Sequence, residues 1–325
     1  MADLTYPEQP SARSRWILQH RGLKNPLDSS RPYAWLIEKE LSAEGQLVDG
    51  LTVFLTNKEC PWRCLMCDLW QNTTDKTVPV GAIVEQIDHA LGQAKQQFGS
   101  LAKFHQIKLY NAGSFFDAQA IPPAEDTKIA KRLAKFERVI VECHPALISE
   151  RCLQFNEALD GKLEVALGLE TVHRESLAKL NKRVTLEEFQ AAASLLTKNK
   201  IDLRSFVLLQ PPFIPEEESV EWAKRSVEFS RRCGASVTCV IPTRTGNGAL
   251  DTLAKAGQFT EPTLDQLEAV MDASIGNSDH RVFADLWDLE RFSRCPKCFE
   301  SRKLRLSEQN DTQRVLKTVA CSSCR

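Results

Sequence analysis

The amino-acid sequence predicts an α/β protein built around a parallel β-sheet. Six segments are apolar and rich in β-branched residues, as is typical of strands that are buried on both faces. Segments with apolar residues at helical spacing separate most of them, and this alternation favours parallel strands linked by helices. A six-stranded doubly wound sheet and a partial barrel of βα units both fit the pattern.

The expected elements follow one another in a regular order. The strands cover 47–57, 104–111, 137–145, 163–171, 201–215 and 235–246. The main helices cover 81–98, 126–136, 186–200, 218–234 and 263–276. A short helix is also expected at 33–45, after a flexible lead. The sequence contains no internal repeat and no low-complexity tract.

Composition places the chain among ordinary globular proteins. It has 325 residues, of which 42% are hydrophobic and 26% are charged. No apolar run approaches the roughly 20 residues that a membrane span requires. The first residues lack the apolar core of a secretory signal. We therefore expect a cytoplasmic protein that makes no contact with a membrane.

The cysteines favour metal binding over disulfide bonding. Seven of the eleven lie in tight clusters, and a chain of this size does not need disulfide bonds for stability. The other four are expected to be buried small apolar residues: Cys143, Cys152, Cys233 and Cys239.

Charge is distributed unevenly along the chain. The formal net charge is −1, but residues 291–325 carry nine basic residues against three acidic ones. Residues 11–31 carry five basic residues against one acidic residue. Two basic ends on an acidic body indicate a polyanionic partner, although solvated basic surface explains the pattern equally well.

Three cysteines lie within eight residues directly after the first expected strand. They are Cys60, Cys64 and Cys67, in the stretch "NKECPWRCLMCDLW". Three thiolates do not complete a four-coordinate zinc site. A 4Fe–4S cluster normally takes four cysteines, so three would leave one iron open for a small molecule. The alternatives are a chance cluster or a zinc site with a distant fourth ligand.

This Cys-x3-Cys-x2-Cys spacing resembles that of the radical S-adenosylmethionine (SAM) superfamily. The resemblance implies that the open iron chelates the amino and carboxylate groups of SAM. It also implies that an electron from a reductant such as flavodoxin or ferredoxin cleaves SAM to a 5′-deoxyadenosyl radical. The residue before the third cysteine is often aromatic in this family. Here it is Met66, which is able to pack on an adenine face.

The resemblance covers residues 48–250 and implies a partial (βα)6 barrel. It places the SAM amino group at the strand-end sequence "NAGS", at Asn111, Gly113 and Ser114. Glu170, in "GLET", would hold the ribose hydroxyls, and Arg183 would pair with the SAM carboxylate. The segment "VIPTRTGNG" would add backbone contacts to adenine.

A further strand-end residue, His144 in "ECHP", is expected to point toward the barrel mouth. There it would contact substrate or donate a proton. A histidine whose hydrogen bonds are satisfied within the protein is the simpler interpretation.

The C-terminal segment contains two Cys-x2-Cys pairs. Cys295 and Cys298 are separated by 22 residues from Cys321 and Cys324, and the spacer has the pattern of strand, polar turn and strand. This layout predicts a small zinc ribbon with four cysteine ligands, with a second iron–sulfur cluster as the alternative. The chain thus divides into a basic lead with a short helix (1–46), the barrel (47–289) and the ribbon (290–325).

Several phrases resemble the group that contains the radical SAM subunit of archaeosine synthase. They are "LTNKECPWRCLMCDLW", "IKLYNAGSFFDAQAIPP" and "VIVECHP". That group is related to the radical SAM part of the elongator catalytic subunit. The resemblance implies a lyase or transferase that modifies transfer RNA (tRNA).

Two other functions remain open from the sequence. The first is a radical SAM enzyme for a small metabolite or a peptide, with a structural ribbon. The second is a non-catalytic nucleic-acid-binding protein. A tRNA substrate predicts that five basic side chains of the tail face the barrel mouth: Arg302, Lys303, Arg305, Arg314 and Lys317.

Overall fold

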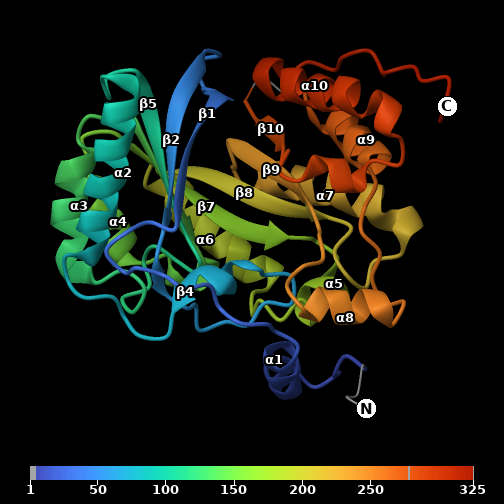
Figure 1. Ribbon diagram of the computed structural model, residues 1–325, viewed down its shortest axis with the longest axis horizontal. Helices are drawn as coiled ribbons and strands as arrows, with labels where there is room; N and C mark the ends of the chain where they lie inside the picture. The colour runs from blue at the N-terminus through green and yellow to red at the C-terminus, as the bar shows by residue number, and fades with distance from the viewer. Residues whose placement is uncertain (1–4, 277–278, 325) are drawn as a thin grey trace.

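A curved eight-stranded sheet organises the computed structural model, which describes residues 5–276 and 279–324 (Figure 1). The strand order is β1-β2-β5-β6-β7-β8-β9-β10. The strands are β1 (Ala34–Leu41), β2 (Leu47–Leu55), β5 (Phe104–Asn111), β6 (Arg138–Cys143), β7 (Lys162–Glu170), β8 (Asp202–Leu209), β9 (Val237–Pro242) and β10 (Arg281–Ala284). All pairs are parallel except β1 with β2.

The six expected strands are the six central strands of this sheet, β2 and β5 to β9, in the expected order. The curled sheet confirms the partial barrel. Its two edge strands, β1 and β10, form no ladder with each other in the described chain, so the barrel stays open on one side. The carboxyl ends of the seven parallel strands form the mouth of the barrel.

Helices cover the outer face of the sheet (Figure 1). They are α2 (Ala82–Phe98), α3 (Asp126–Leu133), α4 (Glu150–Ala158), α6 (Leu186–Lys198), α7 (Ser219–Arg232) and α9 (Leu264–Ser274). Strand residues such as Val53, Leu109 and Val141 are fully buried against them. Because side chains alternate along a strand, the neighbouring residues point into the barrel. Within the described residues, no helix is both long and apolar enough to cross a bilayer.

Buried ion pairs fill the amino end of the barrel. The Arg204 guanidinium contacts the carboxylates of Glu164 at 2.6 Å and Glu40 at 2.5 Å, and Lys108 Nζ lies 2.7 Å from Glu40. Burial alone would raise the pKa of Glu40, but Arg204 and Lys108 hold it well below its ordinary value. Mutual pairing offsets the cost of burying these charges. Paired side chains therefore occupy the amino end of the barrel, opposite its mouth.

The prediction of a short helix at 33–45 is wrong. This segment forms β1, which pairs with β2 along its whole length from Ala34 to Leu41. The apolar cluster Trp35–Ile37 suits a helix or a strand, and pairing with β2 decides between them. The lead instead contains a helix nearer the N-terminus, α1 (Pro10–Gln19).

The prediction of a strand–turn–strand ribbon in the C-terminal segment is also wrong. Most of the spacer between the cysteine pairs belongs to one helix, α10 (Pro296–Thr312). The rest of the spacer, residues 313–320, forms no strand. The buried residues of α10 follow helical spacing: Cys298, Phe299, Arg302, Arg305, Leu306 and Gln309. Two of them are arginines, so the spacing of apolar residues alone does not indicate an amphipathic helix here.

Helix α10 seals the free edge of β10. The side-chain amide of Asn310 donates to Ala284 O at 2.9 Å and accepts from Ala284 N at 2.8 Å. The amide of Gln313 bonds in the same way to Val282, at 2.9 and 2.7 Å. These amides replace the hydrogen bonds that a ninth strand would make.

Candidate functional site

The three-cysteine loop lies at the barrel mouth. It is closed at its base by a short parallel pair of β3 (Asn57–Lys58) and β4 (Thr73–Thr74). Asn247 Nδ2 donates to Leu65 O at 2.8 Å and to Cys67 O at 3.2 Å. Asn181 Nδ2 donates to Arg63 O at 2.7 Å. The loop backbone is thus held by residues that follow β7 and β9.

The N-terminal segment packs against the same loop. Leu65 is fully buried in an apolar cluster with Trp16 and Ile17 of α1 and Leu250 of α8 (Ala249–Lys255). Met66 packs against this cluster from its partly buried position. Helix α1 therefore supports the cysteine loop from outside the barrel.

The thiols of the loop suit metal binding. Burial raises the pKa of Cys60 to about 11 and those of Cys64 and Cys67 to about 12. Such thiols carry a proton at neutral pH unless a metal replaces it. Among the described residues, these three thiols are not gathered as a group around one point that would hold a single metal ion. Thiolates that bind separate irons of a 4Fe–4S cluster are not required to lie so close.

Unpaired polar atoms gather beside this loop. Asn111 at the end of β5 is 1% exposed, and both polar atoms of its side chain lack a hydrogen-bond partner within the described residues. A buried polar group without a partner is costly, so these atoms are available to a ligand. Gly113, with φ 145°, lies between them and the loop: a Cβ there would be 3.4 Å from Cys60 Cβ and 3.7 Å from Asn111 Nδ2.

Ser114 and His144 have structural roles. Ser114 Oγ accepts from His144 N at 2.8 Å. The His144 ring stacks on Trp62 at 3.7 Å, accepts from Ala146 N at Nδ1 and donates from Nε2 to Lys182 O at 3.0 Å. Burial lowers the pKa of His144 to about 4, so the ring is neutral. Its hydrogen bonds are satisfied, in agreement with the simpler interpretation.

Glu170, at the end of β7, pairs with a lysine. Lys182 Nζ lies 2.7 Å from Glu170 Oε1, and both side chains are largely buried. Arg183 points elsewhere: its exposed guanidinium donates to Pro10 O at 2.8 Å and to Asn181 Oδ1 at 3.1 Å. Lys182 is thus the basic side chain that reaches the site residue Glu170.

Unusual backbone conformations mark the mouth. Five non-glycine residues in the loops after β7 and β8 have positive φ: Glu170 (65°), Asn181 (57°), Arg183 (62°), Gln210 (55°) and Phe213 (69°). Each costs energy, and such strain is concentrated at functional sites. Gln210 and Thr243, at the ends of β8 and β9, also carry a buried side-chain oxygen without a partner in the described chain.

Sequence reasoning missed three of these residues. Lys182 is adjacent to Arg183, and only the left-handed turn through Asn181 and Arg183 determines which of the two faces Glu170. Asn247 lies in the "VIPTRTGNG" segment that was expected to contact adenine, but its side chain holds the cysteine loop. Gln210 follows the β8 strand, for which the sequence offered no candidate.

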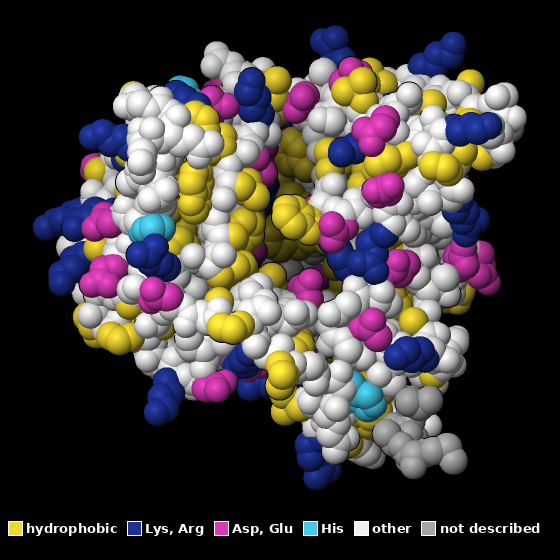
Figure 2. Space-filling model, in the orientation of Figure 1, with side chains coloured by type: hydrophobic (Ala, Val, Ile, Leu, Met, Phe, Trp, Pro, Cys, Tyr) yellow, Lys and Arg dark blue, Asp and Glu magenta, His cyan; other side chains and the backbone are white. Residues whose placement is uncertain are grey.

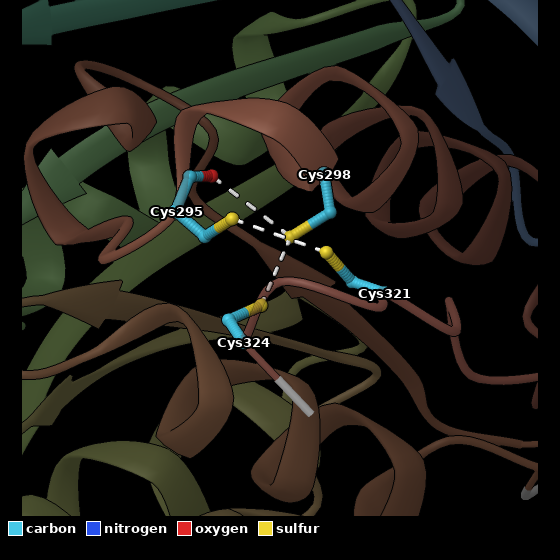
Figure 3. Close-up of side chains that lie close together, drawn as sticks. All are labelled: Cys295, Cys298, Cys321 and Cys324. Atoms are coloured by element: carbon cyan, nitrogen blue, oxygen red, sulfur yellow. Dashed lines mark hydrogen bonds between the residues drawn. The ribbon is translucent and has the colours of Figure 1, made fainter.

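The four tail cysteines form a second candidate metal site (Figure 3). The sulfurs of Cys295 and Cys321 are 3.9 Å apart, and those of Cys298 and Cys324 are 3.6 Å apart. All four lie within 4.8 Å of one another. The cysteine pairs are brought together as predicted, although a helix and an irregular tail carry them instead of a ribbon.

Comparison with known proteins supplies relatives. No protein-family model matches the chain. Two archaeosine synthase beta subunits are similar to it. That of Methanosarcina acetivorans is 25% identical over 66% of this chain and 63% of its own length. That of Thermococcus kodakarensis is 29% identical over 50% of this chain and 51% of its own length. The matched region thus spans half to two thirds of these subunits.

An uncharacterized protein of Methanocaldococcus jannaschii is 24% identical over 76% of this chain and 70% of its own length. Among solved structures, the archaeal Elp3 of Methanocaldococcus infernus has a TM-score of 0.53, with 11% identity over 79% of this chain and 63% of that chain. This likeness concerns the fold. The chain is thus similar in sequence to the archaeosine synthase beta subunits and in fold to archaeal Elp3.

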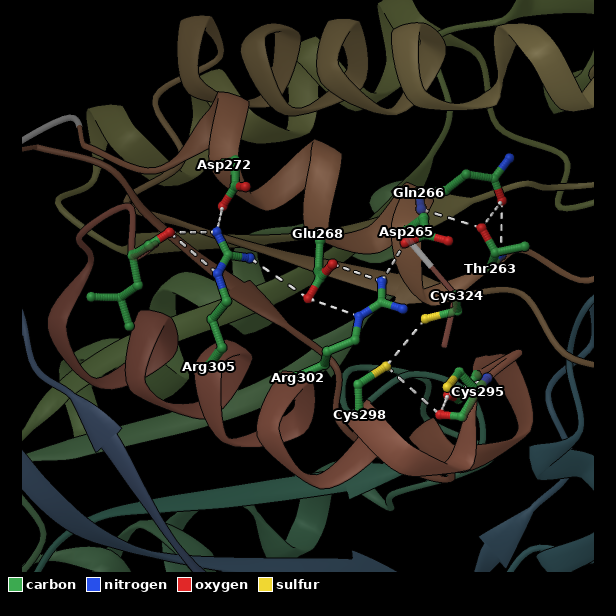
Figure 4. A network of polar contacts seen from close by, with 12 residues as sticks. Thr263, Asp265, Gln266, Glu268, Asp272, Cys295, Cys298, Arg302, Arg305 and Cys324 are labelled. Carbon is green, nitrogen blue, oxygen red and sulfur yellow. Dashed lines mark hydrogen bonds and ion pairs between the residues drawn. The ribbon is translucent and has the colours of Figure 1, made fainter. Parts of the chain in front are cut away.

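Two of the five basic tail residues expected at the barrel mouth are paired internally. Arg302 contacts Asp265 at 2.6 Å and Glu268 at 2.7 Å, and Arg305 contacts Asp272 at 2.6 Å (Figure 4). Both arginines are buried against α9, so they do not face the barrel mouth as a tRNA-binding tail predicts. Lys303, Arg314 and Lys317 are exposed.

The basic residues near the N-terminus are similarly engaged. Arg13 donates to Ala178 O at 2.7 Å, Arg21 and Lys24 pair with Glu59 at 2.6 and 2.9 Å, and Arg31 lies 3.6 Å from Asp28. Acidic partners thus neutralise Arg21, Lys24 and Arg31, whereas the carbonyl partners of Arg13 leave its charge in place.

Proposed function

We propose that this chain is a radical SAM enzyme whose Cys60, Cys64 and Cys67 hold a 4Fe–4S cluster. When bound, such a cluster supplies the electron that cleaves SAM to a 5′-deoxyadenosyl radical. The proposal rests on one observation above all: the unpaired, buried Asn111 amide lies beside a three-cysteine loop at the mouth of a partial barrel.

We assign different groups of the SAM molecule to different residues of the chain. We assign the SAM carboxylate to Lys182, whose ammonium is already in the site, in place of Arg183. Glu170 accepts hydrogen bonds from the ribose hydroxyls, and the Asn111–Gly113 backbone meets the amino group. The cysteine loop and its cover of α1 exclude bulk water from this side.

The substrate that we propose is a nucleoside of tRNA, as for an archaeosine synthase-like lyase. The support comes from the two relatives named archaeosine synthase subunit beta. Those relatives are named as subunits, and two of the basic tail residues, Arg302 and Arg305, are paired with acidic residues of α9. We therefore propose that a partner chain provides much of the contact with the tRNA backbone.

A second candidate function is a radical SAM enzyme for a small metabolite or a peptide. The internal pairing of Arg302 and Arg305 favours it, because a small substrate needs no phosphate-binding surface. In either case the reductant would be a flavodoxin or a ferredoxin.

For the tail we propose one zinc ion. A Zn–S bond of about 2.3 Å places tetrahedral ligands about 3.8 Å apart. The sulfur separations of 3.6 and 3.9 Å match this value. A second iron–sulfur cluster, in which each thiolate binds a different iron, would spread the four sulfurs further.

The first test is release of 5′-deoxyadenosine by the anaerobically reconstituted, reduced protein. It is run with host tRNA and with the same tRNA digested to nucleosides. We expect strong stimulation by intact tRNA alone. Equal slow release in both samples would favour the second candidate function. Cys64→Ala should abolish release, whereas Cys233→Ala, a cysteine at the end of α7 outside both sites, should not.

A further inference from the structure

The inner face of the barrel carries an aromatic floor just above the buried ion pairs. Ring centroids of Phe54 and Tyr110 are 6.3 Å apart, and those of Tyr110 and Phe206 are 6.2 Å apart. All three side chains are partly exposed, whereas the strand residues beside them are 0% exposed: Val53, Leu109 and Val207. The aromatic rings therefore border open space inside the barrel. Figure 2 shows a hollow with an apolar interior near the centre of this face.

Glu142 projects into the same interior. Its neighbours Val141 and Cys143 belong to the outer core, so the side chain between them points inward. In the sheet register Glu142 pairs with Ala166 of β7, a small residue that leaves space in front of it. The charged groups that act on its carboxyl are Lys182 and Glu170. Glu142 thus lies between the proposed SAM-binding pair and the aromatic floor.

This carboxyl group has no cation of its own. Lys182 Nζ contacts Glu170, and no basic side chain of the described chain forms an ion pair with Glu142. Within the described chain, its carboxyl group accepts a hydrogen bond from the backbone of Asn111. A carboxyl has capacity for several hydrogen bonds, so most of that capacity is directed into the hollow.

We propose that Glu142 binds the N–H edge of a planar nitrogen heterocycle of the substrate. The heterocycle would stack on one of the two nearly perpendicular rings of Tyr110 and Phe206 and meet the other edge-on. Carboxylates accept hydrogen bonds from base N–H groups, and aromatic side chains stack on any base. The inference rests on the proposed function and deepens it: the reacting nucleoside would enter the barrel with its base unstacked.

The ionisation of Glu142 agrees with this role. Burial raises its pKa to about 8, although Lys182 and the Asn111 N–H oppose the rise. The free protein therefore keeps the group largely neutral at pH 7. An incoming donor edge provides the hydrogen bonds that stabilise the ionised carboxylate.

The test compares wild type with Glu142→Gln, which keeps the shape but cannot ionise. The matched control is Glu137→Gln, an exposed glutamate just before β6 at the opposite end of the same strand. Host tRNA is the substrate, 5′-deoxyadenosine release gives kcat and KM, and equilibrium dialysis gives the affinity for SAM. We expect a KM at least about tenfold higher for Glu142→Gln, with unchanged SAM affinity and an unchanged control.

The possible results separate this inference from the proposed function. No stimulation of the wild type by tRNA would reject the proposed function itself. A stimulated wild type with an unchanged KM in Glu142→Gln would overturn the inference alone, as would a loss confined to SAM affinity. If Glu142→Gln fails to fold, the same measurement is made on Phe206→Leu, which lacks the aromatic ring. An unchanged KM for this variant would contradict the proposed aromatic contact with the base.

Discussion

Lys182 and Glu170 pack as an ion pair directly over Gly168. A Cβ at position 168 would lie 2.2 Å from Glu170 Oε1 and 2.3 Å from Lys182 Nζ, so only glycine leaves room for the pair. The pairing raises the pKa of Lys182 despite the opposing effect of burial, so the lysine keeps its positive charge at the barrel mouth. This positive charge is able to pair with the Glu170 carboxylate and, under the proposed function, with the carboxylate of SAM as well.

The first prediction distinguishes Lys182 from its neighbour. Lys182→Gln should weaken SAM binding about tenfold or more, because a charge-assisted hydrogen bond is lost. Arg183→Gln removes the same charge one residue away and should change the affinity less than about twofold. Equilibrium dialysis of labelled SAM against the reconstituted variants measures both. The reverse order of effects would return the role to Arg183.

The second prediction concerns the support of the cysteine loop. Asn247→Ala removes both hydrogen bonds to the loop carbonyls of Leu65 and Cys67. Leaving buried carbonyls without donors costs about 1–3 kcal/mol. We expect iron to be lost to a chelator at least about threefold faster than from wild type. Asn199→Ala, at the exposed end of α6, is the control and should retain iron normally.

The third prediction concerns the tail. Purified protein should contain about one zinc per chain. Cys298→Ser should lower the zinc content without lowering the iron content of the reconstituted protein, because the two sites share no ligand. Elemental analysis checks both metals in one sample. If Cys298→Ser instead lowers iron and leaves zinc unchanged, the tail holds an iron–sulfur cluster.

The fourth prediction concerns the edge of β10. Asn310→Ala leaves the N–H and C=O of Ala284 without partners, and the free energy of unfolding should fall by about 1–3 kcal/mol. Glu308→Ala changes an exposed side chain of the same helix and should have an effect below about 0.5 kcal/mol. Urea denaturation followed by circular dichroism measures the difference. Equal stability of the two variants would show that the amide adds nothing to the edge.

The fifth prediction concerns pH. The pKa of Glu142 is 4.5 when unperturbed and about 8 in the folded chain. Between these values the unfolded chain releases a proton that the folded chain retains, so folding loses stability as pH rises. Glu142→Gln removes this loss. Its advantage in the free energy of unfolding should grow from about pH 4.5, reach on the order of 5 kcal/mol and level off above about pH 8.

Denaturant unfolding of the metal-free proteins at a series of pH values tests this dependence. A constant difference between Glu142→Gln and wild type across the range would mean that the carboxyl ionises normally in the folded chain. Glu137→Gln serves again as the control.

The sequence specified the central sheet because its strands are apolar on the face that packs against helices. It also specified both cysteine groups, since their spacings are local. It failed where distant contacts decide. Residues 34–41 became a strand because β2 lay beside them, and α10 was hidden because Arg302 and Arg305 occupy its buried face. Lys182 rather than Arg183 faces Glu170 because of a left-handed turn. Asn247 has its role through a hydrogen bond to Cys67, which lies 180 residues earlier in the chain.

Asn310 of α10 and Gln313, which directly follows that helix, also bear on the proposed polymer substrate. Because Asn310 and Gln313 occupy the edge of β10, the sheet does not close into a ring with β1. A ring would have to be threaded by a free end of a polymer. The gap between β1 and β10 is bridged at its amino end by α10 and by the Arg281–Leu41 hydrogen bond. Under the proposed function, one unit of an uninterrupted chain would enter from the mouth, with the flanking units left outside. For a polynucleotide, this difference separates modification of an internal position from trimming of an end.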